Sequence, residues 1–214
     1  MGNPDRPTPR GIILGPRLSN LLYNGGSHGS RTLKEDTEWL HAARNGDQKA
    51  FRRLVEKYES RVAATVIGMV GRGDEAEDIG QETFIRFYRS LHAFREESGV
   101  GTYLTRIAIN LCLDALKRRN RHLSRASPRS EEDLATAAAR EEKPRLEARE
   151  IVRQGLARLD DKFRAVVVLR MLLGHSTRET ARILGLPVGT VLSRLARAQR
   201  KLKDILTPLY GGNP

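Results

Sequence analysis

Apolar residues recur along most of this chain at the three- and four-residue spacing of amphipathic α-helices. The clearest series runs from Phe51 to Val70 and ends at Gly71, a residue that commonly terminates helices. No stretch shows the alternating pattern of a β-strand, so the sequence predicts an all-α fold. The other predicted helices cover residues 36–44, 74–91, 102–117, 151–159 and 163–173.

Short polar residues precede several of these helices and are expected to cap them. Asp47 precedes the longest helix, and Thr102 precedes the fourth. Asp160 or Asp161 is expected to cap the helix over residues 163–173. These caps satisfy backbone N–H groups that have no partner inside a helix.

Residues 176–203 have the features of two helices joined by a tight turn. Ser176 and Glu179 form the S-x-x-E capping box of a helix start. Gly185 supplies the backbone freedom that a sharp turn needs, and Pro187 suits the first turn of the next helix. The segment is therefore predicted to be a helical hairpin.

The second helix of this hairpin is apolar on one side and polar or basic on the other. Val191, Leu195, Ala198 and Leu202 recur at spacings of four, three and four. A small residue, a glycine four later and an apolar residue six beyond it are typical of a DNA-reading helix-turn-helix. An ordinary hairpin with a solvated basic face also fits the pattern. The candidate DNA-binding side chains are Thr190, Ser193, Arg194, Arg197, Arg200 and Lys201.

Changes in composition divide the chain into four parts. Residues 1–34 are rich in Pro and Gly and are predicted to be a disordered tail. Residues 35–120 form a first small helical domain, and residues 148–209 form a second. Between them, residues 121–147 lose periodicity and are predicted to be a flexible linker. One apolar series interrupts the tail, at Leu18, Leu21, Leu22 and Tyr23, and is compatible with a short helix whose docking place the sequence does not give.

The net charge of +12 is unevenly distributed along the chain. Residues 148–214 carry 13 basic and 5 acidic side chains, whereas residues 35–120 carry 14 of each. A positive field concentrated around the hairpin suits a polyanion such as DNA.

Composition also excludes several classes of protein. Cys112 is the single cysteine, which excludes a disulfide framework and a multi-cysteine zinc site, and its apolar helix face favours burial. The histidines lack ligand spacing, and no phosphate-binding loop or nucleophile elbow occurs, so we expect no metal, no cofactor and no enzymatic activity. No apolar run approaches the ~20 residues of a membrane span, and no signal-peptide core is present, so we expect a cytoplasmic protein without membrane insertion.

Charges of opposite sign gather on two helices of the first domain. Five carboxylates crowd residues 74–82, more than compensation of the helix dipole requires, and this face suits a basic or polar protein surface. Basic residues and Asn110 lie on or after the fourth helix, where Arg and Lys can bind phosphate and Asn can pair with a base edge.

These residues carry a resemblance to a known family. Residues 74–84, followed by Phe94, 102–104 and 106–110, resemble sigma domain two of bacterial RNA polymerase sigma factors. Residues 159–161 and 174–206 are similar to sigma domain four. The short linker, without a third domain, resembles the extracytoplasmic-function group, and the resemblance covers about residues 36–208.

The resemblance implies a sigma factor that binds core RNA polymerase and directs promoter recognition and transcription initiation. It implies that Asp78, Gln81 and Glu82 contact the clamp helices of the β′ subunit, with the β subunit as a further partner. It implies −35 recognition by the second hairpin helix, and an anti-sigma factor as a regulator. Tyr103 stands where Trp is common, and Leu192 where Lys is frequent. The implied −10 contacts are Tyr103, Arg106, Asn110, Lys117, Arg118 and Arg119.

The main alternative is a stand-alone helix-turn-helix transcriptional regulator, whose DNA-binding hairpin has a similar pattern. The acidic helix over residues 74–82 argues against this alternative, as does the lack of an αβ receiver pattern. An enzyme that holds Mg²⁺ through these carboxylates is a more distant alternative, because no second carboxylate cluster accompanies them.

Overall fold

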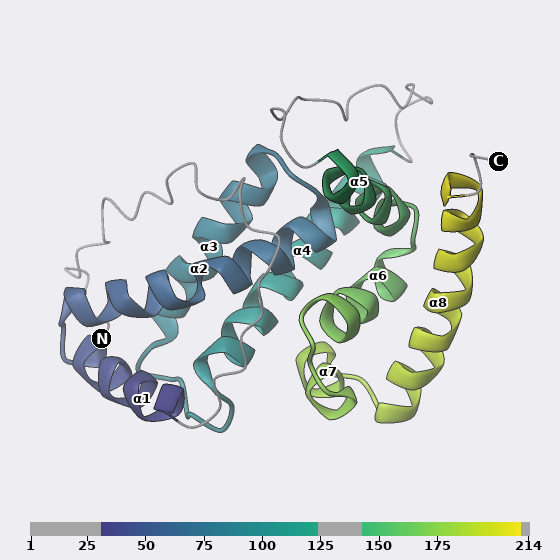
Figure 1. Ribbon diagram of the computed structural model, residues 1–214. Coiled ribbons are helices and arrows are strands. Elements are labelled where there is room, and N and C mark those ends of the chain that lie inside the picture. The colour runs from purple at the N-terminus through teal and green to yellow at the C-terminus, as the bar shows by residue number, and fades with distance from the viewer. Residues whose placement is uncertain (1–30, 124–142, 211–214) are drawn as a thin grey trace.

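The computed structural model describes residues 31–123 and 143–210, and all of its regular elements are helices (Figure 1). The prediction of an all-α fold is confirmed. The first group consists of α1 (Arg31–Arg44), α2 (Gln48–Val70), α3 (Asp74–Ser90) and α4 (Val100–Leu123). The second consists of α5 (Lys143–Ala157), α6 (Asp161–Val167), the π-helical turn η2 (Val168–Leu172), α7 (Thr177–Leu184) and α8 (Val188–Tyr210).

In the first domain α2 is the central helix and lies against α1, α3 and α4. Its apolar stripe is closed to solvent: Leu54 and Val66 are fully buried, and Phe87 and Leu104 meet them from α3 and α4. Cys112 is buried in the same cluster, and this burial raises the pKa of its thiol to about 12. Cys112 is thus a small apolar residue of the core, as the sequence predicted.

The expected cap at Asp47 is confirmed, because its carboxylate accepts hydrogen bonds from the N–H groups of Lys49 at 2.8 Å and Ala50 at 3.2 Å. The expected cap at Thr102 is wrong. Helix α4 begins at Val100, which is 3% exposed, so Thr102 already lies inside its first turn.

Close packing explains why α4 starts earlier than expected. A Cβ at Gly101 would lie 2.8 Å from the Tyr58 ring, so the small residue lets the first turn of α4 approach α2. The burial of Val100 against the core then fixes this turn as helix.

Of the two candidates for the cap of α6, Asp160 is confirmed at the N-cap position, but its side chain does not make the capping bond. Asp160 occupies the N-cap position of α6, and its backbone carbonyl accepts from the N–H groups of Phe163 and Arg164, both at 2.9 Å. Its carboxylate makes no capping bond and instead accepts a hydrogen bond from Lys201 Nζ at 2.7 Å. A salt bridge to α8 has replaced the local cap.

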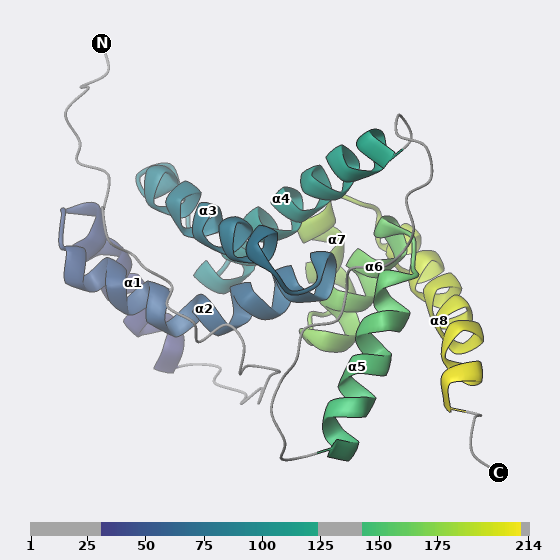
Figure 2. The same ribbon diagram turned by 90° about the horizontal axis from the view of Figure 1, so that it is seen from above.

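The two helical groups pack against each other, which the sequence did not predict. Helices α2 and α4 contact α6, α7 and η2, and Figures 1 and 2 show α8 on the side away from α1. One apolar cluster continues across the boundary, from Met69 and Ala108 to Val168 and Leu169. A Cβ at Gly68 would lie 3.0 Å from Val168 Cγ2, so the absence of a side chain at this position of α2 lets the second domain pack closely against it.

Helix ends differ in part from the predicted boundaries. Helix α1 begins within the last residues of the predicted tail, and α4 and α5 extend into the two ends of the predicted linker. The rest of that tail and linker, residues 1–30 and 124–142, lies outside the described residues. Within the described ranges, every helix is too short or too polar to cross a bilayer.

Candidate functional site

The acidic surface predicted for polymerase binding lies on the exposed side of α3. Asp78 and Gln81 are exposed, and Glu82 is partly exposed. The three residues follow i, i+3 and i+4 spacing, so they share one face of the helix. The Glu82 carboxylate accepts a hydrogen bond from Arg86 Nε at 2.8 Å, an exposed pair that adds little stability. The structure therefore brings all three predicted residues together.

Ile85 is a residue of this face that the sequence reasoning missed. It is 37% exposed and is one of four exposed large hydrophobic residues in the described part of the chain. It follows Gln81 by four positions and Glu82 by three, so helical spacing alone could have placed it on the acidic surface. An apolar side chain beside carboxylates gives this face both a hydrophobic and an electrostatic contact.

Three of the predicted −10 residues form an exposed stripe along α4. Arg106, Asn110 and Lys117 are exposed and lie on one side of the helix, at spacings of four and seven. Lys117 Nζ lies 3.7 Å from Asp114 Oδ1, but both side chains are largely exposed, so the ammonium is available to a stronger anion. Arg118 is exposed at the edge of this stripe.

Tyr103 is partly buried in an aromatic cluster rather than displayed on the surface. Its ring centroid lies 4.6 Å from that of Phe94 and 6.1 Å from that of Phe87. These contacts tie the ring to the core of the first domain. Stacking of a DNA base on Tyr103 is therefore limited to the parts of the ring that the cluster leaves exposed.

Arg119 is separated from the other candidates on α4. It follows Lys117 by two positions, so it lies on a different side of the helix. Its charge is close enough to lower the pKa of Arg164 in the second domain, after the larger effect of burial. Arg119 thus faces the contact between the domains and does not join the stripe in this arrangement.

The hairpin predicted from residues 176–203 has the expected turn geometry. The Ser176 N–H donates to Glu179 Oε2 at 2.8 Å, and the Glu179 N–H donates to Ser176 Oγ at 3.2 Å, so the capping box is confirmed. The backbone bond from Ser176 is also the main reason why the pKa of Glu179 is lowered. Gly185 has φ 63° and ψ 38°, the left-handed conformation that ends α7 and turns the chain into α8.

Helix α8 presents its basic side to solvent because its apolar side is held by α6 and α7. Val191 and Ala198 are fully buried, which fixes the rotation of the helix about its axis. Arg194, Arg197 and Arg200 have no ion-pair or hydrogen-bond partner among the side chains that the structure describes. Of the six predicted −35 residues, Ser193, Arg197 and Arg200 are exposed on this outward side. The other three lie on its flank, where Thr190 and Arg194 are partly buried and Lys201 is exposed.

Lys201 differs from the arginines of α8 because it already has partners. Its ammonium donates to Asp160 Oδ2 at 2.7 Å and lies 5.0 Å from the centroid of the Phe163 ring. The hydrogen bond from Lys201 is the main reason why the pKa of Asp160 is lowered. Any contact of Lys201 with phosphate competes with this pair.

The chemistry available at these surfaces is binding by charge, hydrogen bonds and shape. Across residues 31–123 and 143–210, no three His, Cys, Asp or Glu side chains gather closely enough to hold a metal ion. The acidic face belongs to α3, the −10 stripe to α4 and the −35 face to α8, and Figure 2 shows these helices spread across the molecule.

Comparison with known proteins gives two family matches in the same order. The family "Sigma-70 region 2" matches residues 54–122, and "Sigma-70, region 4" matches residues 149–202. The chain is 31% identical over 189 residues to the RNA polymerase sigma-H factor of Pseudomonas aeruginosa, covering 83% of this chain and 97% of that relative. It is 35% identical over 187 residues to the ECF RNA polymerase sigma-E factor of Escherichia coli, covering 81% of this chain and 95% of that one.

Two solved structures have a similar fold. CnrH, in its complex with the cytosolic domain of CnrY, matches with a TM-score of 0.62 and 26% identity over 81% of this chain and 98% of that chain. The sigma factor RpoE of Bartonella quintana, in complex with the anti-sigma factor NepR, matches with a TM-score of 0.63 and 24% identity. That match covers 74% of this chain and 98% of the RpoE chain and bears on the fold alone.

Two helical domains of these families, one with an acidic helix and one with an outward basic recognition helix, define a sigma factor of bacterial RNA polymerase. As a sigma factor, the protein binds core RNA polymerase and directs it to promoters for transcription initiation. Within this class, the chain belongs to the extracytoplasmic-function group.

Proposed function

We propose that this sigma factor divides promoter recognition among three surfaces, with α3 binding polymerase, α4 binding the −10 element and α8 reading the −35 element. The observation that carries this proposal is the rotation of α8. Val191 and Ala198 have no exposed surface and fix the rotation of the helix, so Ser193, Arg197 and Arg200 face outward, while Thr190, Arg194 and Lys201 lie on the flank beside them. An α-helix with this geometry fits the major groove of B-DNA.

Roles on the recognition helix follow from position along it. Early residues approach base edges, so Thr190, Ser193 and Arg194 are assigned sequence readout. Arg200 and Lys201 lie later and are assigned phosphate contacts, while Arg197 can serve either purpose. Thr190 is the third residue of α8, which supports its assignment to the N-terminal end of the helix that would enter the DNA major groove.

In the first domain, Asp78, Gln81 and Glu82 are assigned to the clamp helices of the β′ subunit. The exposed Ile85 on the same face supports a protein partner, because a purely electrostatic surface needs no aliphatic side chain. Arg106, Asn110, Lys117 and Arg118 are assigned to the −10 element, and Arg119 joins them only if the domains separate.

The protein acts by binding rather than by catalysis, and we place it in the cytoplasm, with core polymerase and DNA. An anti-sigma factor is part of this proposal as a further partner. The solved neighbour CnrH, 26% identical to this chain, was captured in a complex with a protein domain, the cytosolic domain of CnrY.

Reconstituted transcription tests the proposal. Purified chain and core polymerase are incubated with a library of templates that vary at the −35 and −10 positions, and run-off transcripts are sequenced. We expect transcripts only in the presence of the chain, with preferences at both elements. Preference at one element only, or equal transcription without the chain, would contradict the assignment.

A further inference from the structure

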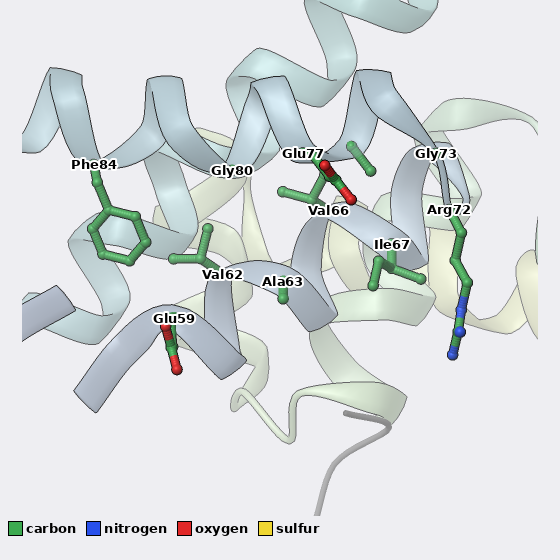
Figure 3. A pocket seen from close by; sticks show the side chains of 11 residues that line it. Glu59, Val62, Ala63, Val66, Ile67, Arg72, Gly73, Glu77, Gly80 and Phe84 are labelled. Atoms are coloured by element: carbon green, nitrogen blue, oxygen red, sulfur yellow. The ribbon is translucent and has the colours of Figure 1, made fainter. Parts of the chain in front are cut away.

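A groove runs between α2 and α3 on the surface of the first domain (Figure 3). Its volume of about 80 Å³ accommodates an aliphatic side chain and is smaller than the ~150 Å³ cavity that holds benzene. Phe84 lies at one end and Arg72 at the other (Figure 3). The walls are mainly apolar and come from Val62, Ala63, Val66, Ile67, Ala76 and Phe84.

Gly80 keeps the wall formed by α3 open. A Cβ at this position would have no atom within 4 Å apart from its own helix and chain neighbours. Glycine is a poor helix former, so Gly80 destabilises α3 relative to alanine without relieving any clash. A larger residue fits at position 80 and would extend into the groove, which provides a way to fill the groove without disturbing the core.

The edges of the groove carry acidic side chains. Glu59 lies at its edge on α2, and Glu77 at its edge on α3. Asp74 and Asp78 continue the negative charge along the exposed side of α3. An apolar groove between carboxylates selects a ligand that combines aliphatic and basic side chains.

The chain itself contains such a ligand. Residues 17–23, hereafter the tail segment, read Arg-Leu-Ser-Asn-Leu-Leu-Tyr. Leu18, Leu21 and Leu22 have the i, i+3, i+4 spacing of one helix face, and Arg17 directly precedes them. The first 34 residues carry five basic side chains and one acidic side chain, so their charge is complementary to the groove edges.

The described structure begins at Arg31, the first residue of α1, and its level along α2 follows from the contacts of α1. Asp36 of α1 accepts a hydrogen bond from Lys57 Nζ of α2 at 2.5 Å. Because α1 and α2 are consecutive helices joined by a tight turn and run antiparallel, Arg31 lies near the level of the α2 turn that holds Glu59 and Val62. Arg31 follows Tyr23 by eight positions, and an extended chain of eight residue steps spans up to ~26–29 Å.

We propose that the tail segment binds in the groove between α2 and α3 of its own chain, with its leucines against the apolar walls and Arg17 beside the edge carboxylates. The proposal assigns a place to the helix-spaced leucines of the tail. It also accounts for a glycine at position 80, where a side chain would occupy the space that the leucines need.

A consequence follows that rests on the proposed function. A bound helix is about 10 Å wide, so one lying in the groove also covers Glu77 and the adjoining Asp78 and Gln81. The tail segment and core polymerase therefore compete for α3. If the segment occupies the groove nine-tenths of the time, the apparent Kd for polymerase rises about tenfold.

Paramagnetic labelling of the full chain tests the docking itself. Ser19→Cys is labelled with a nitroxide, while the native Cys112 stays unlabelled because it is fully buried. We expect methyl signals of Val62, Val66 and Ile67 to broaden strongly and the signal of Val191 in α8 to keep its intensity. Uniform broadening, or broadening confined to other helices, would overturn the proposal.

Filling the groove provides the matched comparison. Gly80→Leu should restore the broadened signals, whereas Gly189→Leu should not, because Gly189 is a helical glycine with equally open space outside the groove. Persistence of the broadening in Gly80→Leu would show that the segment binds elsewhere. A second variant, Leu21→Ser with Leu22→Ser, tests the ligand side and should have the same effect as Gly80→Leu.

Mixing experiments identify whose tail is bound. A labelled chain without isotope is mixed with an isotope-enriched chain without label, and we expect no broadening. Broadening in the mixture would mean that a second copy supplies the segment, which would overturn intramolecular docking.

The affinity for core polymerase tests whether the docked tail segment competes with polymerase, independently of whether it docks. The Leu21→Ser, Leu22→Ser chain should bind core polymerase about tenfold more tightly than the native chain. If the two chains bind polymerase with equal affinity, the tail segment does not compete with polymerase. Whether the segment binds in the groove is decided separately by the labelling experiment. If neither chain binds polymerase, the proposed function fails, and the labelling result still stands.

Discussion

The guanidinium of Arg164 in α6 donates a hydrogen bond from Nη1 to the carbonyl oxygen of Met69 in the last turn of α2, at 2.7 Å. The same group donates to the carbonyls of Leu156 at 2.8 Å, Ala157 at 2.8 Å and Leu159 at 2.9 Å, at the C-terminal end of α5. One buried cation thus satisfies the free carbonyls of two helices from two domains, where the helix dipoles favour positive charge.

Arg164→Met should destabilise the folded chain strongly. The substitution keeps an apolar stem but leaves four carbonyl oxygens of the domain contact without this donor, at an expected cost of about 2–4 kcal/mol in the free energy of unfolding. Urea unfolding measures this cost. The matched control is Arg158→Met, an exposed arginine directly after the end of α5, which should change the free energy by less than about 0.5 kcal/mol. Equal effects of the two variants would show that the buried hydrogen bonds contribute nothing.

Asp78→Arg and Glu82→Lys should each abolish association with core polymerase. Both replace a carboxylate on the acidic face of α3 by a cation, and both positions are at least partly exposed, so the fold should be retained. Co-purification with core polymerase measures binding, and circular dichroism checks the fold. Glu38→Lys, an exposed charge reversal on α1, is the control and should bind normally. If both α3 variants bind core polymerase like the native chain, the acidic face of α3 is not the polymerase-binding surface.

Arg194→Ala should relax sequence preference at one base pair of the −35 element. If the guanidinium pairs with a guanine, its removal costs about 1–3 kcal/mol on the cognate site and less on sites that lack that base. Holoenzyme binding to a panel of −35 variants measures the loss at each position. A uniform loss on every site would instead assign Arg194 to phosphate.

Lys201→Ala should weaken binding to all promoters alike and lower the salt slope by roughly one unit. Because the ammonium is bound to Asp160 in the free protein, Asp160→Asn should act in the opposite direction and strengthen DNA binding. The measurement is affinity at several salt concentrations for both variants. A change of base preference in Lys201→Ala would mean that α8 lies in the groove with a different orientation.

Stability should fall as the pH drops through the range in which histidine titrates. His175 is 4% exposed, and burial, then the charge of Arg61, lowers its pKa, while Glu179 acts in the opposite direction. The unfolded chain takes up a proton near pH 6.5 that the folded chain resists, so the stability present above pH 6.5 is lost as the pH falls. Urea unfolding at pH 7.5 and 5.5 should show a smaller difference for His175→Leu than for the native chain. An identical pH dependence would mean that other groups cause the change.

The elements of this fold follow from local patterns in the sequence. Helical periodicity placed the helices, and the chemistry of Asp47, Ser176 and Glu179 predicted the N-terminal caps of α2 and α7 that the structure confirms. The outward side of α8 follows from Val191 and Ala198 alone, because two buried positions fix the rotation of a helix.

Contacts between distant segments could not be predicted in this way. Arg164 appears in the sequence as one more basic residue of a periodic helix, and its acceptors are backbone carbonyls, which no side-chain pattern marks. The side chains of Thr102 and Asp160 have the right chemistry for caps, yet the burial of Val100 and the salt bridge to Lys201 outweighed the local preference. Tertiary packing decided all of these positions.

The contact of Gly68 with Val168 has a consequence for how related chains diverge. Any side chain at position 68 meets the Val168 methyl groups at 3.0–3.2 Å, so an alanine there requires a smaller partner or a shift of η2. Substitutions at these two positions are therefore not independent. Among homologues that keep this domain arrangement, we expect the pair to evolve together, with a glycine facing a branched residue or a larger residue facing a small one.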